Sequence, residues 1–330
     1  MRILIVGLGS IGRRHLTNLR LLEPDAHITV WRQYSRGDAG LENLENVHVV
    51  SSETEALERK PHVAFITGPA STHIPTAFLL AREGISLFIE KPLSSDMIGV
   101  NELIAVCREK RLTLMVGYNL RFNEGLRRMK EALAEGAIGR LLAFRAEAGM
   151  YLPDWRVGTD YRSGVSGRRE LGGGAALELS HELDYARWLG GEIKALCART
   201  ARASDLDIDV EDLAEVIVEF DNGAIGNIHI DMIQRAPVRQ CRLIGSTGTL
   251  LWDGIRNETG LYSANRESWT RLWDTHEADR NQTYVAEAAH FLECFKSQRD
   301  PLIPGEDGAQ SLALALAVKR SSELGKWVSP

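Results

Sequence analysis

Cysteine, excess positive charge and long apolar runs are all scarce in this sequence, and each shortage excludes a class of protein. The four cysteines stand far apart and form no CxxC pair, which disfavours a disulfide framework, and the histidines show no HExxH or paired Cys/His spacing for a metal centre. No apolar run approaches the roughly 18–20 residues that span a bilayer. The net charge of −6 provides no basic face for the phosphates of nucleic acid. We therefore expect a cytoplasmic protein that binds no membrane, no nucleic acid and no metal.

The chain begins with a strand–turn–helix pattern typical of nucleotide binding. Gly7, Gly9 and Gly12 form GxGxxG after the apolar stretch RILIV. The first glycine permits a tight turn, the second lets the backbone approach a pyrophosphate, and the third lets the helix pack close to the sheet. Ser10 and Ile11 open the helix, whose N-terminus would face the anion. In this context the pattern predicts a dinucleotide site.

The end of the second predicted strand, residues 27–32, bears on the choice of cofactor. An NAD-specific site usually places an acid there to bind the ribose 2′-hydroxyl, whereas this chain has Arg32, with Arg36 four residues further on. A guanidinium binds a 2′-phosphate through two hydrogen bonds, and an acid would repel it. The sequence therefore favours NADP over NAD, with two solvated surface arginines as the alternative.

Further strands alternate with helices through the first 120 residues. The stretches HVAFITG, SLFIEKP and LTLMVGYN each hold an apolar core, and helical segments such as IPTAFLLAREG separate them. Such alternation predicts a doubly wound parallel sheet, on which ligands lie beyond the carboxyl ends of the strands. The candidates for the site are therefore the residues that follow these strand ends: Gly68, Pro69, His73, Glu90, Lys91 and Asn119.

Lys91 is the most informative of these candidates. It follows the stretch LFIE and precedes Pro92, whose ring restricts the backbone on both sides and makes a cis peptide bond cheap. A lysine held there would project its ammonium over the ligand, where it can stabilise an alkoxide or relay a proton. A surface lysine at a strand end is the alternative.

The pattern changes near residue 120, so we expect one domain at 1–120 and a second at 121–330. The second part opens with the amphipathic stretch GLRRMKEALAEGAIG and continues with strand-like segments separated by turns such as DNG and GSTG. It predicts an α+β domain with a large, mostly antiparallel open sheet. One face of that sheet needs cover, and we expect a second subunit to supply it in a homodimer or homotetramer. Within the sheet, His229 and Asp231 fall on the same side of a strand, which predicts a polar contact of structural type.

The motifs taken together resemble those of one family. It shows the same elements in the same order: GLGSIGRRH, GPASTH, EKPLS, GYNLRF, GGGAALELSHELD, GSTGTLLWD and EDGAQSLALALAVKRS. Over essentially its whole length the chain is similar to the Gfo/Idh/MocA oxidoreductases, which include glucose–fructose oxidoreductase and inositol dehydrogenase. The resemblance implies a nicotinamide-dependent oxidoreductase that acts on CH–OH groups of a sugar, polyol or nucleotide-sugar derivative.

The resemblance also implies roles for single residues. The lysine of the family's EKP motif matches Lys91, the histidine of its glycine-rich motif matches His181, and the aspartate three residues later matches Asp184. The family's arginine after GYN matches Arg121, as a substrate or structural contact. The family usually has an acid four residues before the histidine, whereas here Glu178 stands three residues before it. Glu178 is therefore a candidate stand-in for that acid.

The stretch ELGGGAALELSHELDY predicts one helix that carries the chemistry. At about 100° per residue, Glu178, His181 and Asp184 would share one arc of the helix, and Leu179 and Leu183 would bury the other side. His181, with an ordinary pKa near ~6.5, would take the hydroxyl proton as a general base. Either Glu178 or Asp184 would orient its imidazole.

The segment before this stretch, residues 150–169, is rich in aromatic and basic residues. Tyr151 and Trp155 would stack on a sugar ring, and Arg168 would hold a phosphate or carboxylate. A long surface or interface loop is the alternative. The predicted substrate contacts are Lys91, Asn119, Arg121, Tyr151, Trp155, Arg168 and His181.

Two other functions stay open. Some members of the resembled family use the same site for NAD-dependent glycoside cleavage through transient oxidation and elimination, which recycles the cofactor. A non-catalytic nucleotide sensor would need only the glycine turn, and the presence of both Lys91 and His181 disfavours it.

Overall fold

The chain folds into two compact units. The computed structural model describes residues 1–32, 46–156, 158–275 and 281–330. Met1–Tyr118 and Asn281–Ala309 form the first unit, and Asn119–Arg280 and Gln310–Pro330 form the second. Residues 281–309, which fall within the predicted second domain, thus cluster with the first unit.

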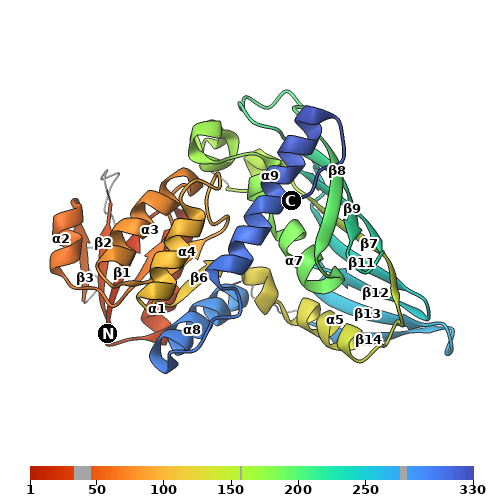
Figure 1. Cartoon of the computed structure of the whole chain (residues 1–330), viewed down its shortest axis with the longest axis horizontal. Coiled ribbons are helices and arrows are strands. Elements are labelled where there is room, and N and C mark those ends of the chain that lie inside the picture. The colour runs from red at the N-terminus through yellow and green to blue at the C-terminus, as the bar shows by residue number, and fades with distance from the viewer. Residues whose placement is uncertain (33–45, 157, 276–280) are drawn as a thin grey trace. The chain divides into compact units, whose positions relative to one another are not determined.

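The first unit is built on a six-stranded sheet in which neighbouring strands run parallel (Figure 1). The order of the strands is β3-β2-β1-β4-β5-β6. Their bounds are β1 Arg2–Val6, β2 His27–Trp31, β3 Val47–Val50, β4 Val63–Ile66, β5 Ser86–Glu90 and β6 Leu114–Gly117. Every residue of β4 and β5 is buried, as expected for central strands with both faces covered. The predicted doubly wound parallel sheet is confirmed.

The α-helices that lie wholly within this unit's described residues are α1 Ser10–Leu22, α2 Glu53–Glu58, α3 His73–Arg82, α4 Val100–Glu109 and α8 Gln282–Ser297. Helix α8 comes from a distant part of the chain and lies beside α1 (Figure 1). The side chains of Asn18 and Asn281 exchange hydrogen bonds of 2.8 and 3.3 Å. The ring of Phe291 stands edge-on to Phe65 of the sheet, with 5.3 Å between ring centres. These contacts explain why the late segment belongs to the first unit.

The second unit is built on an eight-stranded sheet in the order β14-β13-β12-β11-β7-β10-β9-β8. The bounds are β7 Leu141–Gly149, β8 Ile193–Ala201, β9 Leu213–Phe220, β10 Ile225–Asp231, β11 Val238–Gly245, β12 Gly248–Asp253, β13 Glu258–Ser263 and β14 Ser268–Asp274. Strands β7 and β10 pair in parallel, and the other neighbours pair antiparallel. The predicted large, mostly antiparallel sheet is confirmed.

One face of this sheet is covered by helices. Along β7, Phe144 and Ala146 are buried whereas Arg145 between them is exposed, which is the alternation of a sheet with one buried face. Helix α5 (Glu124–Ala134) packs against β12, β13 and β14, and α7 (His181–Gly190) packs against β7 and β10.

Further helical segments complete the fold. Helix α6 is a single turn (Ala175–Glu178), and α9 (Gly305–Leu324) begins in the first unit and continues in the second. The 3-10 turns are η1 Ala70–Thr72, η2 Asn119–Phe122, η3 Leu152–Asp154, η4 Tyr161–Ser163, η5 Val165–Gly167 and η6 Arg169–Leu171. Among the described helices, none is long and apolar enough to cross a membrane.

The four cysteines are free thiols, and three of them, Cys107, Cys241 and Cys294, are buried. Burial raises the pKa of the Cys107 thiol to about 12. Burial likewise raises the pKa of Cys241 well above its ordinary value and raises the pKa of Cys294.

A charged triad lies on strand β10 and its neighbour β9. His229 Nδ1 is 2.6 Å from Glu215 Oε1, and His229 Nε2 is 3.0 Å from Asp231 Oδ2. The predicted contact between His229 and Asp231 is therefore confirmed. Hydrogen bonds to Asp231 and Glu215, together with their charges, raise the pKa of His229 to about 9 against the effect of burial.

The triad makes the stability of the protein depend on pH. Because the folded pKa of about 9 exceeds the ordinary value of about 6.5, the stabilisation is fully present below pH ~6.5 and is lost as the pH rises through 9. We expect the free energy of unfolding of His229→Gln to be lower than that of wild type below pH ~6.5 and nearly equal to it above pH 9. Urea unfolding midpoints measured across the pH range test this, and a difference that does not change with pH would contradict it.

Candidate active site

The glycine turn lies between β1 and α1, and its backbone is closely packed. Gly7 has a φ of +89°, which side-chain-bearing residues rarely adopt, and its N–H donates to the Trp31 carbonyl at 3.0 Å. A Cβ on Gly12 would stand 2.5 Å from the Gly7 carbonyl oxygen and 2.7 Å from Thr67 Oγ1. Only a glycine at position 12 therefore allows α1 to approach the sheet this closely.

The N-terminus of α1 is arranged to receive an anion. The helix begins at Ser10 with Gly9 at its N-cap; no described side chain caps it, and its first turn holds no acid. Its N-terminus therefore presents backbone N–H groups and positive helix dipole to a negative group. Strands β1 and β4 are neighbours at the point where the strand order reverses, which is where such sheets bind ligands.

The predicted cofactor residues of the two loops gather at this edge. Gly7, Gly9, Ser10, Ile11 and Gly12 follow β1, and Gly68 and Pro69 follow β4. The Cβ position of Gly7 is 3.1 Å from the Gly68 nitrogen, so the two loops touch. Arg32 follows β2, is half-buried, and its N–H donates to the Val50 carbonyl at 3.0 Å. Arg36 lies outside the described residues.

The turn that carries Lys91 is held by its neighbours on both sides. Glu90, the last residue of β5, accepts a hydrogen bond from the Lys91 N–H through Oε2 at 3.2 Å and contacts His15 Nε2 through Oε1 at 2.6 Å. The Lys91–Pro92 peptide bond is cis. The Lys91 side chain is half-buried.

His73, predicted to contact the cofactor, is buried and binds backbone instead. Its Nδ1 is 3.0 Å from the Pro92 carbonyl oxygen, and its Nε2 is 2.9 Å from that of Gly68. Burial lowers the pKa of His73, although these hydrogen bonds oppose the shift. The imidazole therefore joins the loop after β4 to the turn that carries Lys91.

The glycine-rich stretch forms two helices rather than the single one predicted. Helix α6 ends at Glu178 and α7 begins at His181, with Leu179 and Ser180 between them. Glu178 and His181 therefore do not share the arc of one helix. The predicted burial of Leu179 and Leu183 is confirmed. Gly174 has a φ of +109°, and a Cβ there would stand 2.5 Å from Glu211 Oε1.

His181 opens α7, and the helix is anchored one turn later by Asp184. His181 is 7% exposed. Arg121 Nε donates to Asp184 Oδ2 at 2.9 Å, and another guanidinium nitrogen of Arg121 donates to Oδ1 at 2.8 Å. The Ser311 hydroxyl also donates to Asp184 Oδ1 at 2.8 Å. Both oxygens of Asp184 are thus engaged, and Arg121 makes a buried bidentate ion pair.

Glu178 and Asn119 differ in exposure. The Glu178 carboxylate is half-buried and accepts a hydrogen bond from the Ser166 hydroxyl at 2.9 Å. Asn119 opens η2 and is buried. Both side chains belong to the second unit, together with Arg121 and His181.

The aromatic and basic segment is partly built into the fold. Tyr151 and Trp155 pack against a buried apolar cluster that includes Leu152 and Met232, and Trp155 Nε1 donates to the Met150 carbonyl at 2.8 Å. Arg168 is exposed and pairs with Glu170 at 3.1 Å. The Tyr151 ring also lies beneath the Arg235 guanidinium, whose central carbon is 3.5 Å from the ring centre, and the Arg168 guanidinium lies at the surface of the loop.

Comparisons with known proteins agree with this architecture. Residues 1–118 match the model of an oxidoreductase family with an NAD-binding Rossmann fold, and residues 126–251 match the GFO/IDH/MocA C-terminal domain. The chain belongs to the Gfo/Idh/MocA oxidoreductase family.

Individual relatives of this oxidoreductase cover nearly the whole chain. Myo-inositol 2-dehydrogenase of Thermotoga maritima is 28% identical, over 98% of this chain and 96% of its own length. The NAD(+) scyllo-inositol 2-dehydrogenase of Bacillus subtilis is 23% identical, over 98% and 95%. Among solved structures, levoglucosan dehydrogenase in complex with NADH and L-sorbose has a TM-score of 0.88 at 20% identity, covering 100% of this chain and 98% of that one. This last likeness shows the fold.

Two further side chains, not predicted from the sequence, hold the helix that begins at His181. Ser311 binds Asp184 across 127 positions of sequence, and no local pattern points to it. Glu182, fully buried in α7, pairs with Arg239 of β11 at 2.8 Å. The sequence does show two acids, Glu182 and Asp184, in the first turn of α7. Their partners lie on other elements, so the sequence does not show what they bind.

The Arg121–Asp184 pair predicts a large stability effect. Asp184→Asn removes the carboxylate charge and leaves the guanidinium buried without it, so we expect the free energy of unfolding to fall by about 3–5 kcal/mol. Urea unfolding measures this. Asp160→Asn is the matched control, because it breaks an exposed pair with Arg162 and should leave the midpoint nearly unchanged. Equal losses in the two variants would contradict the anchoring role of Asp184.

Proposed function

We propose that this oxidoreductase transfers a hydride between a nicotinamide cofactor and a carbinol carbon of a sugar, polyol or nucleotide-sugar derivative. The observation that carries the proposal is the glycine turn at the uncapped start of α1 in the same unit as Lys91, which the turn at the end of β5 holds. Relatives named as inositol 2-dehydrogenases support the substrate class.

The residues of the first unit fit a dinucleotide. Apart from its chain neighbours, no described residue has an atom within 4 Å of a Cβ built on Gly9. Packing within the chain therefore does not require this glycine, which suits a close approach to a pyrophosphate. The first turn of α1 carries no acid that would repel phosphate. The bound nicotinamide supplies the hydride chemistry, and the protein supplies position and charge.

Each candidate side chain has a role in this reaction. In the oxidising direction His181 accepts the proton of the substrate hydroxyl as the C–H bond of the same carbon breaks and the C=O bond forms. The Lys91 ammonium stabilises negative charge on that oxygen. Glu178 orients the imidazole, because both oxygens of Asp184 are engaged by Arg121 and Ser311. In the reducing direction His181 returns the proton.

Other side chains serve the substrate or hold the site. Asn119 offers an amide to a sugar, and the half-buried Trp155 offers an apolar ring. Tyr151, whose ring stacks with the Arg235 guanidinium at 3.5 Å, would contact the sugar beside that pair. Arg168 is the cation for a phosphate or carboxylate at the loop surface. Arg121 acts through Asp184, since its guanidinium is buried in that pair.

Loss of the Lys91 or the His181 side chain should abolish most turnover. Lys91→Ala and His181→Ala are each expected to lower kcat by about 100-fold or more while NADH still binds. The change in absorbance of the reduced nicotinamide, in a screen of polyols, sugars and nucleotide sugars, measures this and separates net oxidation from a cleavage that recycles its cofactor. Lys194→Ala and His48→Ala, both at exposed positions, are the controls. Normal turnover by His181→Ala would refute its assignment.

The cofactor choice depends on Arg32 in this proposal. A guanidinium after β2 favours the 2′-phosphate of NADP, so wild type should bind NADPH more tightly than NADH. Arg32→Asp should reverse the order, because a carboxylate repels the phosphate and accepts from the ribose hydroxyls. Fluorescence titration of both reduced cofactors tests this, and an unchanged ratio would make Arg32 a surface residue only.

We also propose that the protein is a cytoplasmic homodimer or homotetramer assembled through the second unit. Ile217 and Ile225 are 46% and 59% exposed on β9 and β10, on strands whose other face packs the core. Burying such side chains in an interface removes apolar area from water. Sedimentation equilibrium of wild type and of Ile217→Lys tests this: the substitution should weaken assembly, and a monomeric wild type would contradict it.

A further inference from the structure

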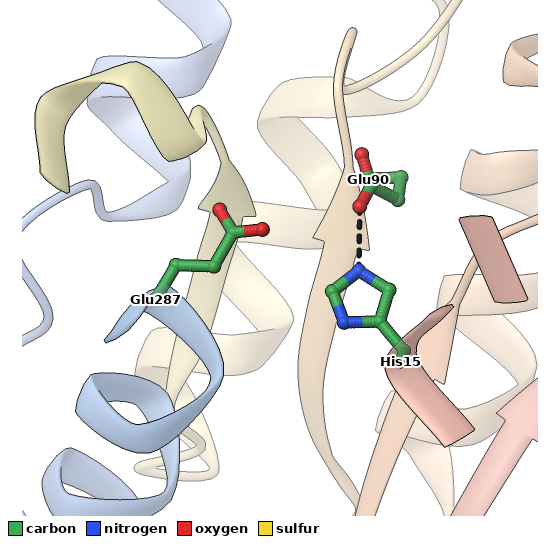
Figure 2. Close-up of side chains that lie close together, drawn as sticks. All are labelled: His15, Glu90 and Glu287. Atoms are coloured by element: carbon green, nitrogen blue, oxygen red, sulfur yellow. Dashed lines mark hydrogen bonds and ion pairs between the residues drawn. The ribbon is translucent and has the colours of Figure 1, made fainter. Parts of the chain in front are cut away.

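Three ionisable side chains meet in the interior of the first unit, away from its surface. They are His15 of α1, Glu90 at the end of β5 and Glu287 of α8, and they are 0%, 5% and 0% exposed. One ring or carboxylate atom of each lies within 4.8 Å of those of the other two. Figure 2 shows the Glu287 carboxylate extended from its helix toward the other two side chains.

The bond between His15 and Glu90 is short and shielded from water. Nε2 of the imidazole is 2.6 Å from Oε1 of the carboxylate (Figure 2). The ring of His15 packs against Phe65 and Phe88, with ring centres 5.4 and 5.1 Å apart. In such an apolar setting a hydrogen bond to a charged group is strong. A carboxylate only accepts, so Nε2 of His15 donates.

The Glu90 carboxylate links His15 to the backbone of Lys91. Glu90 uses Oε1 for His15 and Oε2 for the Lys91 N–H at 3.2 Å. A loss of the donor on α1 therefore releases one side of the Glu90 carboxylate and changes what the lysine backbone binds. His73 holds the other side of the same turn through the Pro92 carbonyl.

Glu287 completes the cluster without adding charge. Among the described residues neither of its oxygens has a hydrogen-bond partner, and an ionised carboxylate in that situation is very costly. Burial first, and then the charge of Glu90, raise the pKa of Glu287 well above its ordinary value, although Arg14 opposes them. The protonated form of Glu287 therefore leaves Glu90 as the single negative charge beside His15.

We propose that His15 and Glu287 are positioning residues for Lys91: His15 fixes Glu90 by hydrogen bonding, and Glu287, held neutral, keeps a second negative charge away from it. The proposal deepens the function proposed above and rests on it for the role of Lys91. It assigns neither residue to contact with substrate.

The placement of Lys91 is measured directly by NMR. In protein made with isotope-labelled lysine, the Cε resonance of Lys91 is assigned by its absence from Lys91→Arg and followed through its titration. His15→Leu removes the donor and should displace both the resonance and its midpoint, whereas His15→Gln keeps an N–H donor and should restore them. An unchanged resonance in His15→Leu overturns the proposal whether or not Lys91 is catalytic. If His15→Leu does not fold, Glu90→Gln takes its place in the experiment, because it weakens the same hydrogen bond and nearly keeps the shape of the side chain.

A mutant cycle on turnover then separates this proposal from the proposed function. With the substrate found in the screen, His15→Leu should lower kcat between about 10- and 100-fold with the NADH dissociation constant unchanged. The same change should have no further effect in Lys91→Ala, because it acts through that lysine. Full activity of Lys91→Ala would refute the proposed function, whereas independent losses from the two changes would refute the positioning role.

The charge state of Glu287 is tested by replacement and by metal analysis. Glu287→Gln has the shape and charge of the protonated acid, so it should leave the Lys91 resonance in place. A displacement as large as that in His15→Leu would refute a neutral Glu287. Elemental analysis of the purified protein should find no stoichiometric transition metal; a metal lost on Glu287→Gln would place a cation where we place a proton and overturn the proposal.

Discussion

The bidentate ion pair between Arg121 and Asp184 is the interaction on which the arrangement of the second unit's candidate residues depends. Burying both charges carries a large desolvation cost, which only good geometry and additional hydrogen bonds offset. Both conditions are met, because the pair is 2.8–2.9 Å across two contacts and Ser311 adds a third. Apolar contacts alone would hold α7 against the sheet without specifying its rotation. The directional pair specifies it, and so orients the residue that opens the helix.

The first unit uses the same kind of constraint on its loops. The His73 ring nitrogens lie 3.0 and 2.9 Å from two backbone carbonyl oxygens, and Glu90 accepts from one backbone N–H and one imidazole. These side chains are buried beside the candidate catalytic lysine and leave its ammonium to other contacts. The backbone of the side chain proposed to react is thus restrained by groups that do not react. Positional accuracy of this kind contributes directly to rate.

Local pattern predicted much of the fold, and long-range packing accounts for what it missed. GxGxxG and the strand–helix alternation have fixed spacings, so the parallel sheet and the glycine turn followed from sequence. The place of α8 depends on contacts such as Asn18 with Asn281, which no local spacing reports. The break between Glu178 and His181 was hidden because their spacing also suits an unbroken helix. The engagement of both Asp184 oxygens involves Ser311, which lies far along the chain and which no local spacing indicates.

The burial of Cys107 and Cys241 bears on how these thiols react with oxidants. Thiolate is the form that peroxides and disulfides attack, and burial raises the pKa of Cys107 to about 12 and that of Cys241 well above its ordinary value. Both sulfurs are therefore mainly protonated at neutral pH, and both are buried. Peroxide that oxidises exposed cysteine thiolates should therefore react slowly with these two thiols.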